Sequence, residues 1–208
     1  MITLSTRPSS GTFALAVALS FILRAAVFYL FVAPGHYYKQ PDSPDYHNGA
    51  LCIGLGAGMH RFNNGQPIFW RTPGYPLYLS WFYKAAGITH SGFEQNEPAQ
   101  RMSIWIQILI SAFIPLIIFA LAYLMTHLYW VANLAMWISV FHIGLVLATA
   151  FLLTEGISLI FFYLFLFFLY KLILQQPKHL ILTALAAAAT LSIYTWIRPM
   201  GECTGLFA

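Results

Sequence analysis

Charge is what this sequence has least of: Asp, Glu, Lys and Arg make up 8% of its 208 residues, whereas hydrophobic residues make up 60%. Soluble domains carry about 25% charged residues. Because so few charges could not keep a surface hydrated, the composition excludes a soluble globular protein. The net charge of +4 does not indicate a nucleic-acid partner, because the basic residues are scattered and form no stripe. It fits attraction to anionic lipid or to a phosphate-bearing substrate.

Cysteine is also scarce. The two cysteines, Cys52 and Cys203, match no metal-binding motif and give no disulfide framework, so we interpret both as small apolar residues. Three histidines, His36, His47 and His60, share one polar segment, but their spacing is not that of metal ligands. The sequence therefore predicts no metal site built on these residue types.

Long apolar runs, in contrast, are plentiful. A membrane-spanning helix needs roughly 20 mostly apolar residues, and a span must be helical because lipid offers the backbone no hydrogen-bond partners. Pro115 lies inside the second run and should kink it. The first run is too long for a signal-peptide core, so we expect it to be retained. Five runs qualify as spans, the last two barely: about 12–33, 103–125, 129–150, 156–174 and 180–197.

The segment 34–101 differs in kind, because it holds nine of the sixteen charged residues. Within it, 43–60 and 73–88 are apolar with polar interruptions, which predicts two short helices lying in the membrane interface. The predicted fold is therefore an all-α, polytopic membrane bundle. It has about five transmembrane helices, a long external loop carrying interfacial helices, and a single transmembrane domain over 1–208.

Orientation follows from the basic residues near the short connections. Lys171 and Lys178 flank the join between the last two spans, and Arg7 precedes the first. The positive-inside rule places these residues in the cytoplasm. Five spans then put the 34–101 loop, the 150–156 join and Arg198 on the opposite face. Because the sequence stops soon after a span, we expect an incomplete N-terminal part of a longer protein.

Two carboxylates just after the first span are the strongest chemical signal. Asp42 and Asp45 lie in the sequence Asp-Ser-Pro-Asp-Tyr, and a partly dry carboxylate beside a membrane suits proton abstraction. The same residues are equally typical of an ordinary turn. On this pattern alone, both interpretations stay open.

Three further residues are candidates on the same predicted face. Arg71 precedes a Pro-Gly turn, where it would bind a phosphate or extend to lipid headgroups. Glu155 follows Thr154 in a short join, where it would act chemically or sit in the first turn of a helix. Arg198 would face a phosphate or anchor the last span. Arg24 lies within the first span, where an unpaired charge is costly.

The order of these motifs resembles the N-terminal part of the GT-C membrane glycosyltransferases, such as protein O-mannosyltransferases and the aminoarabinose transferase that modifies lipid A. Three features carry the resemblance. An acid is followed four positions later by Tyr and then by a small-residue helix, a basic residue precedes a Pro-rich aromatic turn, and a Thr-Glu pair lies between two spans. The matching residues are Asp42, Tyr46 and Ala50, the sequence RTPGYPLYL at 71–79, and Thr154-Glu155.

The resemblance implies a function. A sugar would move, with inversion, from a polyprenyl-phosphate donor to a hydroxyl of a protein, lipid or glycan acceptor at the periplasmic face of a bacterial inner membrane. Asp42 would be the general base, Arg71 would offset charge on the departing phosphate, and Glu155 would position the acceptor or a divalent cation. Many relatives carry a second acid where this chain has Ser43, so Asp45 would take its place. Tyr46, Tyr75 and Arg198 complete the implied substrate-binding set.

Two other interpretations remain. A transporter or channel would use Arg24 and Glu155 to line a polar path, although the sequence has no clear internal repeat of the kind transporters often show. An inactive transferase fragment would simply fold in the membrane.

Overall fold

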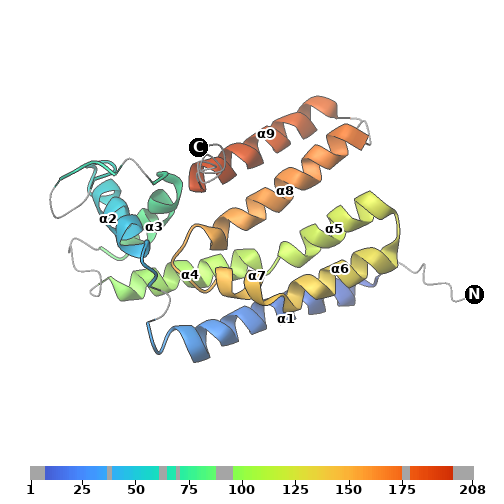
Figure 1. The fold of residues 1–208 in the computed structure, drawn as a ribbon, viewed down its shortest axis with the longest axis horizontal. Helices are drawn as coiled ribbons and strands as arrows, with labels where there is room; N and C mark the ends of the chain where they lie inside the picture. The colour runs from blue at the N-terminus through green and yellow to red at the C-terminus, as the bar shows by residue number, and fades with distance from the viewer. Residues whose placement is uncertain are drawn as a thin grey trace, which may run out of the picture.

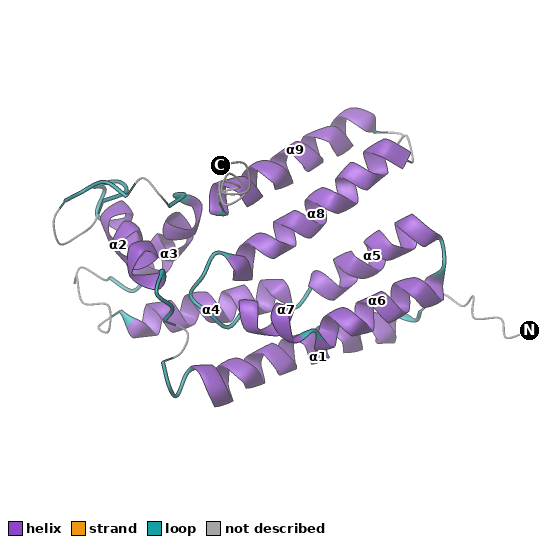
Figure 2. Ribbon diagram, viewed as in Figure 1, coloured by secondary structure: helices purple, strands orange, loops and turns teal. Residues whose placement is uncertain are grey.

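The computed structural model is helical, and it describes residues 8–36, 39–60, 65–68, 71–87, 96–174 and 179–198 (Figures 1 and 2). Those ranges contain no β-strand, which confirms the predicted all-α class. Arg7, Lys178 and Cys203 lie outside them. The elements are α1 (Ser10–Val27), the π-helix η1 (Phe28–Val32), α2 (Ser43–Gly54), α3 (Gly74–Ala85), α4 (Glu97–Ser111), α5 (Ile114–Thr126), α6 (Tyr129–Phe141), α7 (Ile143–Ala148), α8 (Glu155–Leu174) and α9 (Leu180–Ile197).

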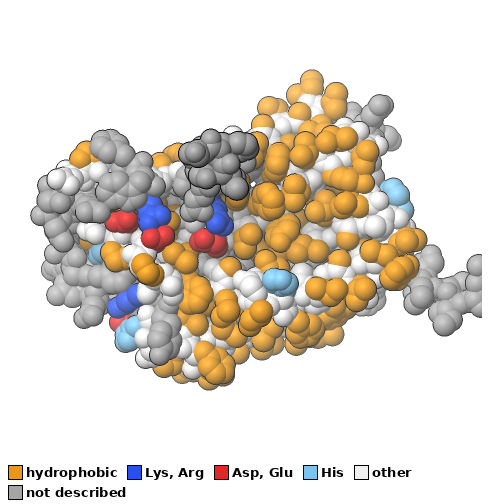
Figure 3. Space-filling model, viewed as in Figure 1, with side chains coloured by type: hydrophobic (Ala, Val, Ile, Leu, Met, Phe, Trp, Pro, Cys, Tyr) orange, Lys and Arg blue, Asp and Glu red, His pale blue; other side chains and the backbone are white. Residues whose placement is uncertain are grey.

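Four helical stretches are long and apolar enough to cross a membrane: Ser10–Val32, Glu97–Thr126, Glu155–Leu174 and Leu180–Ile197. Much of their surface is exposed and apolar, as the space-filling view shows over the middle and right of the molecule (Figure 3). Exposed apolar area of this extent would be unstable in water and is what lipid-facing helices present. These helices therefore indicate a lipid bilayer as the environment of the chain.

The expected span over 129–150 is not one continuous helix. α6 ends at Phe141 and has 13 residues, and α7 is a separate helix of 6 residues. The break occurs because His142 adopts an extended backbone, with φ −69° and ψ 109°, and its side chain caps α7 by accepting a hydrogen bond from Leu145 N at 3.2 Å. A run of apolar residues does not reveal this cap, so the expected count of five spans is not confirmed.

The predicted kink at Pro115 is confirmed. α4 ends at Ser111 and α5 begins at Ile114, with Pro115 in the first turn of the new helix. Proline cannot donate a backbone hydrogen bond and its ring clashes with the carbonyl four residues earlier, so the helix must restart here. α4 begins at Glu97, six residues before the predicted run. A search for apolar residues misses its polar first turn.

The two short helices predicted in the loop are also present, as α2 and α3. α2 packs against α3, and α3 packs against α4, so that the loop is a folded layer rather than a linker. Aromatic and aliphatic side chains fill the space between them, and most are fully buried: Tyr46, Ala50, Leu51, Tyr75, Leu79, Tyr83, Ile104 and Ile108.

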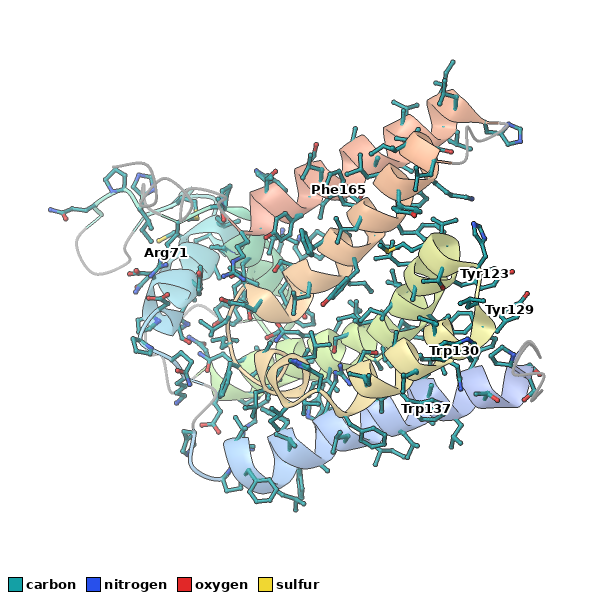
Figure 4. The ribbon with its side chains drawn as sticks, turned by 45° about the vertical axis from the view of Figure 1, so that its right-hand side comes forward. Arg71, Tyr123, Tyr129, Trp130, Trp137 and Phe165 are labelled. Carbon is teal, nitrogen blue, oxygen red and sulfur yellow. The ribbon has the colours of Figure 1, made fainter. Side chains whose placement is uncertain are left out.

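This layer sits at one end of the bundle, together with the start of α4, the start of α8 and the end of α9 (Figure 1). α8 runs away from it, so Lys171 in the last turn of α8 lies toward the other end. At that far end, α5 and α6 meet through stacked Tyr123 and Tyr129, whose ring centroids are 4.4 Å apart (Figure 4). Tyrosines are common where a protein crosses the membrane surface. The fold thus has a charged end, an apolar middle and an aromatic end.

Arg24 is a charged residue within a candidate membrane span. It lies in the last turn of α1 and is completely buried. Its Nη1 donates to the Ser20 carbonyl oxygen at 3.1 Å and contacts the Ser20 hydroxyl, but Nε and Nη2 have no partner among the described residues. A buried guanidinium with unsatisfied donors opposes folding.

We therefore expect Arg24→Met to stabilise the protein by about 1–4 kcal/mol, because methionine fills similar volume without a buried charge. The measurement is thermal unfolding in detergent, with Lys84→Met on the exposed end of α3 as the control for losing one charge. A lower unfolding temperature for Arg24→Met would mean that the guanidinium has a stabilising partner that the bundle itself does not supply.

Candidate active site

Arg71 stands at the centre of the charged end. Its Nη2 forms an ion pair with Oδ1 of Asp42, and its Nε lies 3.5 Å from Oδ2 of Asp45. The Arg71 side chain is 19% exposed, Asp45 is 21% exposed and Asp42 is 48% exposed. The predicted arginine therefore forms one cluster with the two predicted carboxylates, which precede it by 26 residues or more in the chain.

The start of α2 explains how the carboxylates are presented. Pro44 lies in the first turn, where its missing N–H is not needed, and Asp45 lies near the positive end of the helix dipole. Asp42 occupies the capping position, yet its side chain makes no capping hydrogen bond. The turn expected from the sequence is therefore present, and the Asp42 carboxylate still faces Arg71 rather than its own backbone.

Ser43 stands where many members of the resembled family have a second acid, and it has a structural contact. Its hydroxyl donates to the Leu152 carbonyl oxygen at 3.1 Å and accepts from Gln40 N at 2.9 Å. Ser43 is fully buried by these contacts. It ties the first turn of α2 to the non-helical segment 149–154, which leads directly to Glu155.

The Arg71 guanidinium lies over the ring of Tyr46. The guanidinium carbon lies 5.3 Å from the centre of the Tyr46 ring, within the range of a cation–π contact. Burial raises the pKa of Tyr46, while Arg71 and a hydrogen bond with Thr154 act in the opposite direction. Burial lowers the pKa of Arg71, but Tyr46, Asp42 and Asp45 outweigh burial and raise it. Arg71 is thus held as a cation on an aromatic surface.

Glu155 and Arg198 form a second ion pair, with Oε1 and Nη2 3.4 Å apart. Glu155 is the first residue of α8, so it also lies at the positive end of that helix dipole, as the alternative interpretation expected. Thr154 donates its hydroxyl to Glu155 Oε2 at 3.2 Å. Asp42 and Glu155 both contribute to the electrostatic environment of Tyr46, so the two ion pairs belong to one region.

The contact between the start of α3 and the end of α9 lies next to both arginines in the chain. Thr72 donates its hydroxyl to the Ile197 carbonyl oxygen at 2.8 Å, and these two residues are the chain neighbours of Arg71 and Arg198. At Gly74 the backbones approach so closely that a Cβ would overlap the carbonyl oxygen of Trp196. The space-filling view shows basic and acidic side chains side by side in this part of the molecule, and Figure 4 shows Arg71 beside α2 (Figures 3 and 4).

Tyr75, predicted to bind substrate, lies below this cluster. It is completely buried, packs edge-on against Tyr46 at 5.1 Å and donates its hydroxyl to Gln107 Oε1 at 3.3 Å. This arrangement gives Tyr75 no surface for a ligand and makes it a support for Tyr46. The Gln107 amide in turn donates to the carbonyl oxygens of Thr149 and Phe151, at 3.0 and 2.9 Å.

Sequence reasoning missed four of these supporting residues: Ser43, Thr72, Gly74 and Gln107. Gln107 carried the clearest signal, because an amide inside an apolar run is expensive unless it is hydrogen-bonded. Gly74 carried a weaker one, since a glycine opening a helix is common in turns. Ser43 and Thr72 gave no signal, because hydroxyl residues at helix starts usually cap their own helix.

A cation is a poor fit to this cluster. Each of the three carboxylates already faces an arginine. Over the ranges that the structure describes, no group of three or more His, Cys, Asp or Glu side chains is arranged to hold a metal ion. The two guanidinium forks are instead the groups that bind phosphate or carboxylate.

A methyl group at residue 74 tests the α3–α9 contact. We expect Gly74→Ala to destabilise the protein by about 1–3 kcal/mol, because a backbone carbonyl cannot yield to the added atom as a side chain would. Gly54→Ala, in α2, is the matched control: a Cβ there meets nothing within 4 Å. Thermal unfolding in detergent should separate the two variants, and equal effects would show that the close approach at Gly74 is not tight.

Alkaline pH tests the buried tyrosines. Burial raises the pKa of Tyr75 well above the usual value, and raises that of Tyr46. The unfolded chain ionises near pH 10, so stability is fully present below pH 10 and falls as pH rises toward the raised values. Tyr75→Phe should lose about 1–3 kcal/mol at pH 8, because Gln107 loses a partner, but less on going from pH 8 to pH 11. An unchanged alkaline slope would contradict this assignment.

Comparison with family models, curated proteins and solved structures finds no match to this chain. The geometry of the charged end therefore stands as the main basis for a functional proposal.

Proposed function

We propose that this chain belongs to a membrane glycosyltransferase that moves a sugar from a polyprenyl phosphate to an acceptor hydroxyl, with inversion, at the non-cytoplasmic face of a bacterial inner membrane. The observation that carries the proposal is the gathering of Asp42, Arg71, Glu155 and Arg198 at one end of an apolar bundle. These residues come from four separate segments.

The arginines supply the binding chemistry. A planar guanidinium matches the oxygens of a phosphate in two parallel hydrogen bonds, and the two arginines are the chain neighbours of Thr72 and Ile197, which are hydrogen-bonded to each other. Helices with apolar outer surfaces lie directly beside them, so a lipid-borne phosphate can reach the arginines without its tail leaving hydrocarbon. A water-soluble phosphate donor would have no use for such surroundings.

The carboxylates supply the base. Asp42 is half-exposed and lies at the rim of the cluster, where an acceptor hydroxyl can approach it. It would take the hydroxyl proton as the oxygen attacks the anomeric carbon from the side opposite the phosphate, which inverts that carbon. Arg71 would offset the charge that develops on the leaving phosphate, as preorganised cations do best in dry sites. Glu155 would orient the acceptor.

A solute path is the second candidate, and one observation favours it. Arg24 is a buried charge within the candidate span Ser10–Val32, two of its nitrogens have no partner among the described residues, and such residues often mark a transport pathway. The helix break at His142, between α6 and α7, adds irregular backbone, which membrane proteins tolerate where it lines a water-filled cavity or is covered by protein.

A transfer assay tests the proposal. Vesicles containing the full-length protein receive labelled polyprenyl-phosphate sugars and a mixture of protein, lipid and glycan acceptors. We expect Asp42→Asn to lower the rate about 10²–10⁴-fold, because it removes the base. Arg71→Gln should lower it about 10²–10³-fold, because it removes a charge-stabilising donor.

Lys84→Gln is the control for losing a cation, since Lys84 is exposed at the end of α3 and outside the cluster. It should keep the wild-type rate. Solute uptake that Arg24→Met abolishes, without any sugar transfer, would instead support the transport function. Transfer that persists in Asp42→Asn would remove Asp42 as the base.

A further inference from the structure

Both arginines of the site are occupied by carboxylates. Asp42 pairs with Nη2 of Arg71, and Asp45 pairs with its Nε. Glu155 pairs with Nη2 of Arg198. Tyr46 covers one face of Arg71. The Nη2–Nε edge of Arg71, which presents two parallel N–H groups to an anion, is therefore held by carboxylates, and a phosphate that binds this edge must replace one of them.

Asp42 is the carboxylate that gives way most easily. It is more than twice as exposed as Asp45, and its side chain makes no capping bond to α2. Asp45 lies within the first turn of α2, held near the helix dipole. Glu155 has a second contact, from the Thr154 hydroxyl. Asp42 keeps its position mainly through Arg71.

We propose that the Arg71–Asp42 ion pair is a latch that the phosphate of the lipid donor opens. This inference rests on the proposed function and adds to it how the base is controlled. The phosphate takes the guanidinium from Asp42, and the carboxylate oxygen that contacted Arg71 becomes free to accept a proton. Donor binding thus creates the base, and the order of binding is donor first.

The exchange balances in charge and atoms. A sugar phosphodiester bears one negative charge, as a carboxylate does, so Arg71 exchanges one anion for another. In the following step the acceptor O–H proton passes to Asp42, the acceptor oxygen forms a bond to the anomeric carbon, and the bond from that carbon to the phosphate oxygen breaks. The electron pair of the broken bond stays on the phosphate.

Binding of a sugar-free probe tests the latch without requiring transfer. The probe is farnesyl methyl phosphate, a short prenyl phosphodiester, and the measurement is its dissociation constant for the protein in nanodiscs. Asp42→Asn should bind the probe about two- to fivefold more tightly than wild type, because a partly exposed ion pair competes with that strength. The protein that has lost its base then binds its ligand better.

Two controls separate the latch from simple charge repulsion. Glu97→Gln removes a carboxylate from a comparable ion pair, Arg101–Glu97 at 2.5 Å, which belongs to a different cluster. It should leave probe binding unchanged. In an Arg71→Gln background, Asp42→Asn should have no further effect, because Asp42 acts through Arg71.

The outcomes are distinct. Unchanged or weaker binding in Asp42→Asn overturns the latch, and so does tightening that persists in the Arg71→Gln background. Should Arg71→Gln fail to fold, the comparison of Asp42→Asn with Glu97→Gln decides alone. Loss of sugar transfer in Asp42→Asn with unchanged probe binding leaves the transferase standing without the latch. Tighter probe binding with no transfer by wild type leaves the latch and removes the transferase.

Discussion

The assembly of the charged end depends on the hydrogen bonds of the Gln107 side-chain amide. The segment between α7 and α8 is not helical, so its carbonyl groups lack the partners that a helix provides, and hydrocarbon supplies none. Gln107 donates to two of them, at Thr149 and Phe151, and accepts from Tyr75. One amide thus joins α4, α3 and the segment that positions Glu155. Gly156 is required beside it, because a Cβ there would overlap the amide.

The other residues of the site pack in sequence on the residues that Gln107 holds. Tyr75 supports Tyr46, Tyr46 supports Arg71, and Arg71 meets the carboxylates at the start of α2. On the other side, Thr72 holds the end of α9 so that Arg198 reaches Glu155. The charges lie at the surface of this stack, while the hydrogen bonds that place them lie beneath. A buried polar network stabilises a fold only when its donors and acceptors are hydrogen-bonded.

The sequence predicted the helical fold and the charged residues of the site, but not the residues that hold those charges in place. Long apolar runs predict spans because lipid selects for them, and the runs at 156–174 and 180–197 match α8 and α9 within a few residues. The break at His142 was missed, since a side-chain cap depends on local geometry rather than hydropathy. The ion pairs join residues far apart in the chain, so only the fold shows that Arg71 meets Asp42 and that Arg198 meets Glu155. Tyr75 belongs to the substrate-binding set that the resemblance implies, yet it is completely buried, and a motif in the sequence does not show which side of a helix faces the core.

Because carboxylates already pair with both arginines, the site favours a ligand that can replace a carboxylate. Beside an apolar bundle, two unpaired guanidiniums would be costly, and the carboxylates of the chain itself pair with both arginines. A neutral sugar or alcohol cannot replace a carboxylate, whereas a phosphodiester can. In the proposed reaction the proton then neutralises Asp42 while the leaving phosphate gains a charge, so one negative charge moves from the aspartate to the phosphate. Arg71 pairs with Asp42 before the donor binds and with the phosphate afterwards, so that the same guanidinium holds the carboxylate and then stabilises the departing group.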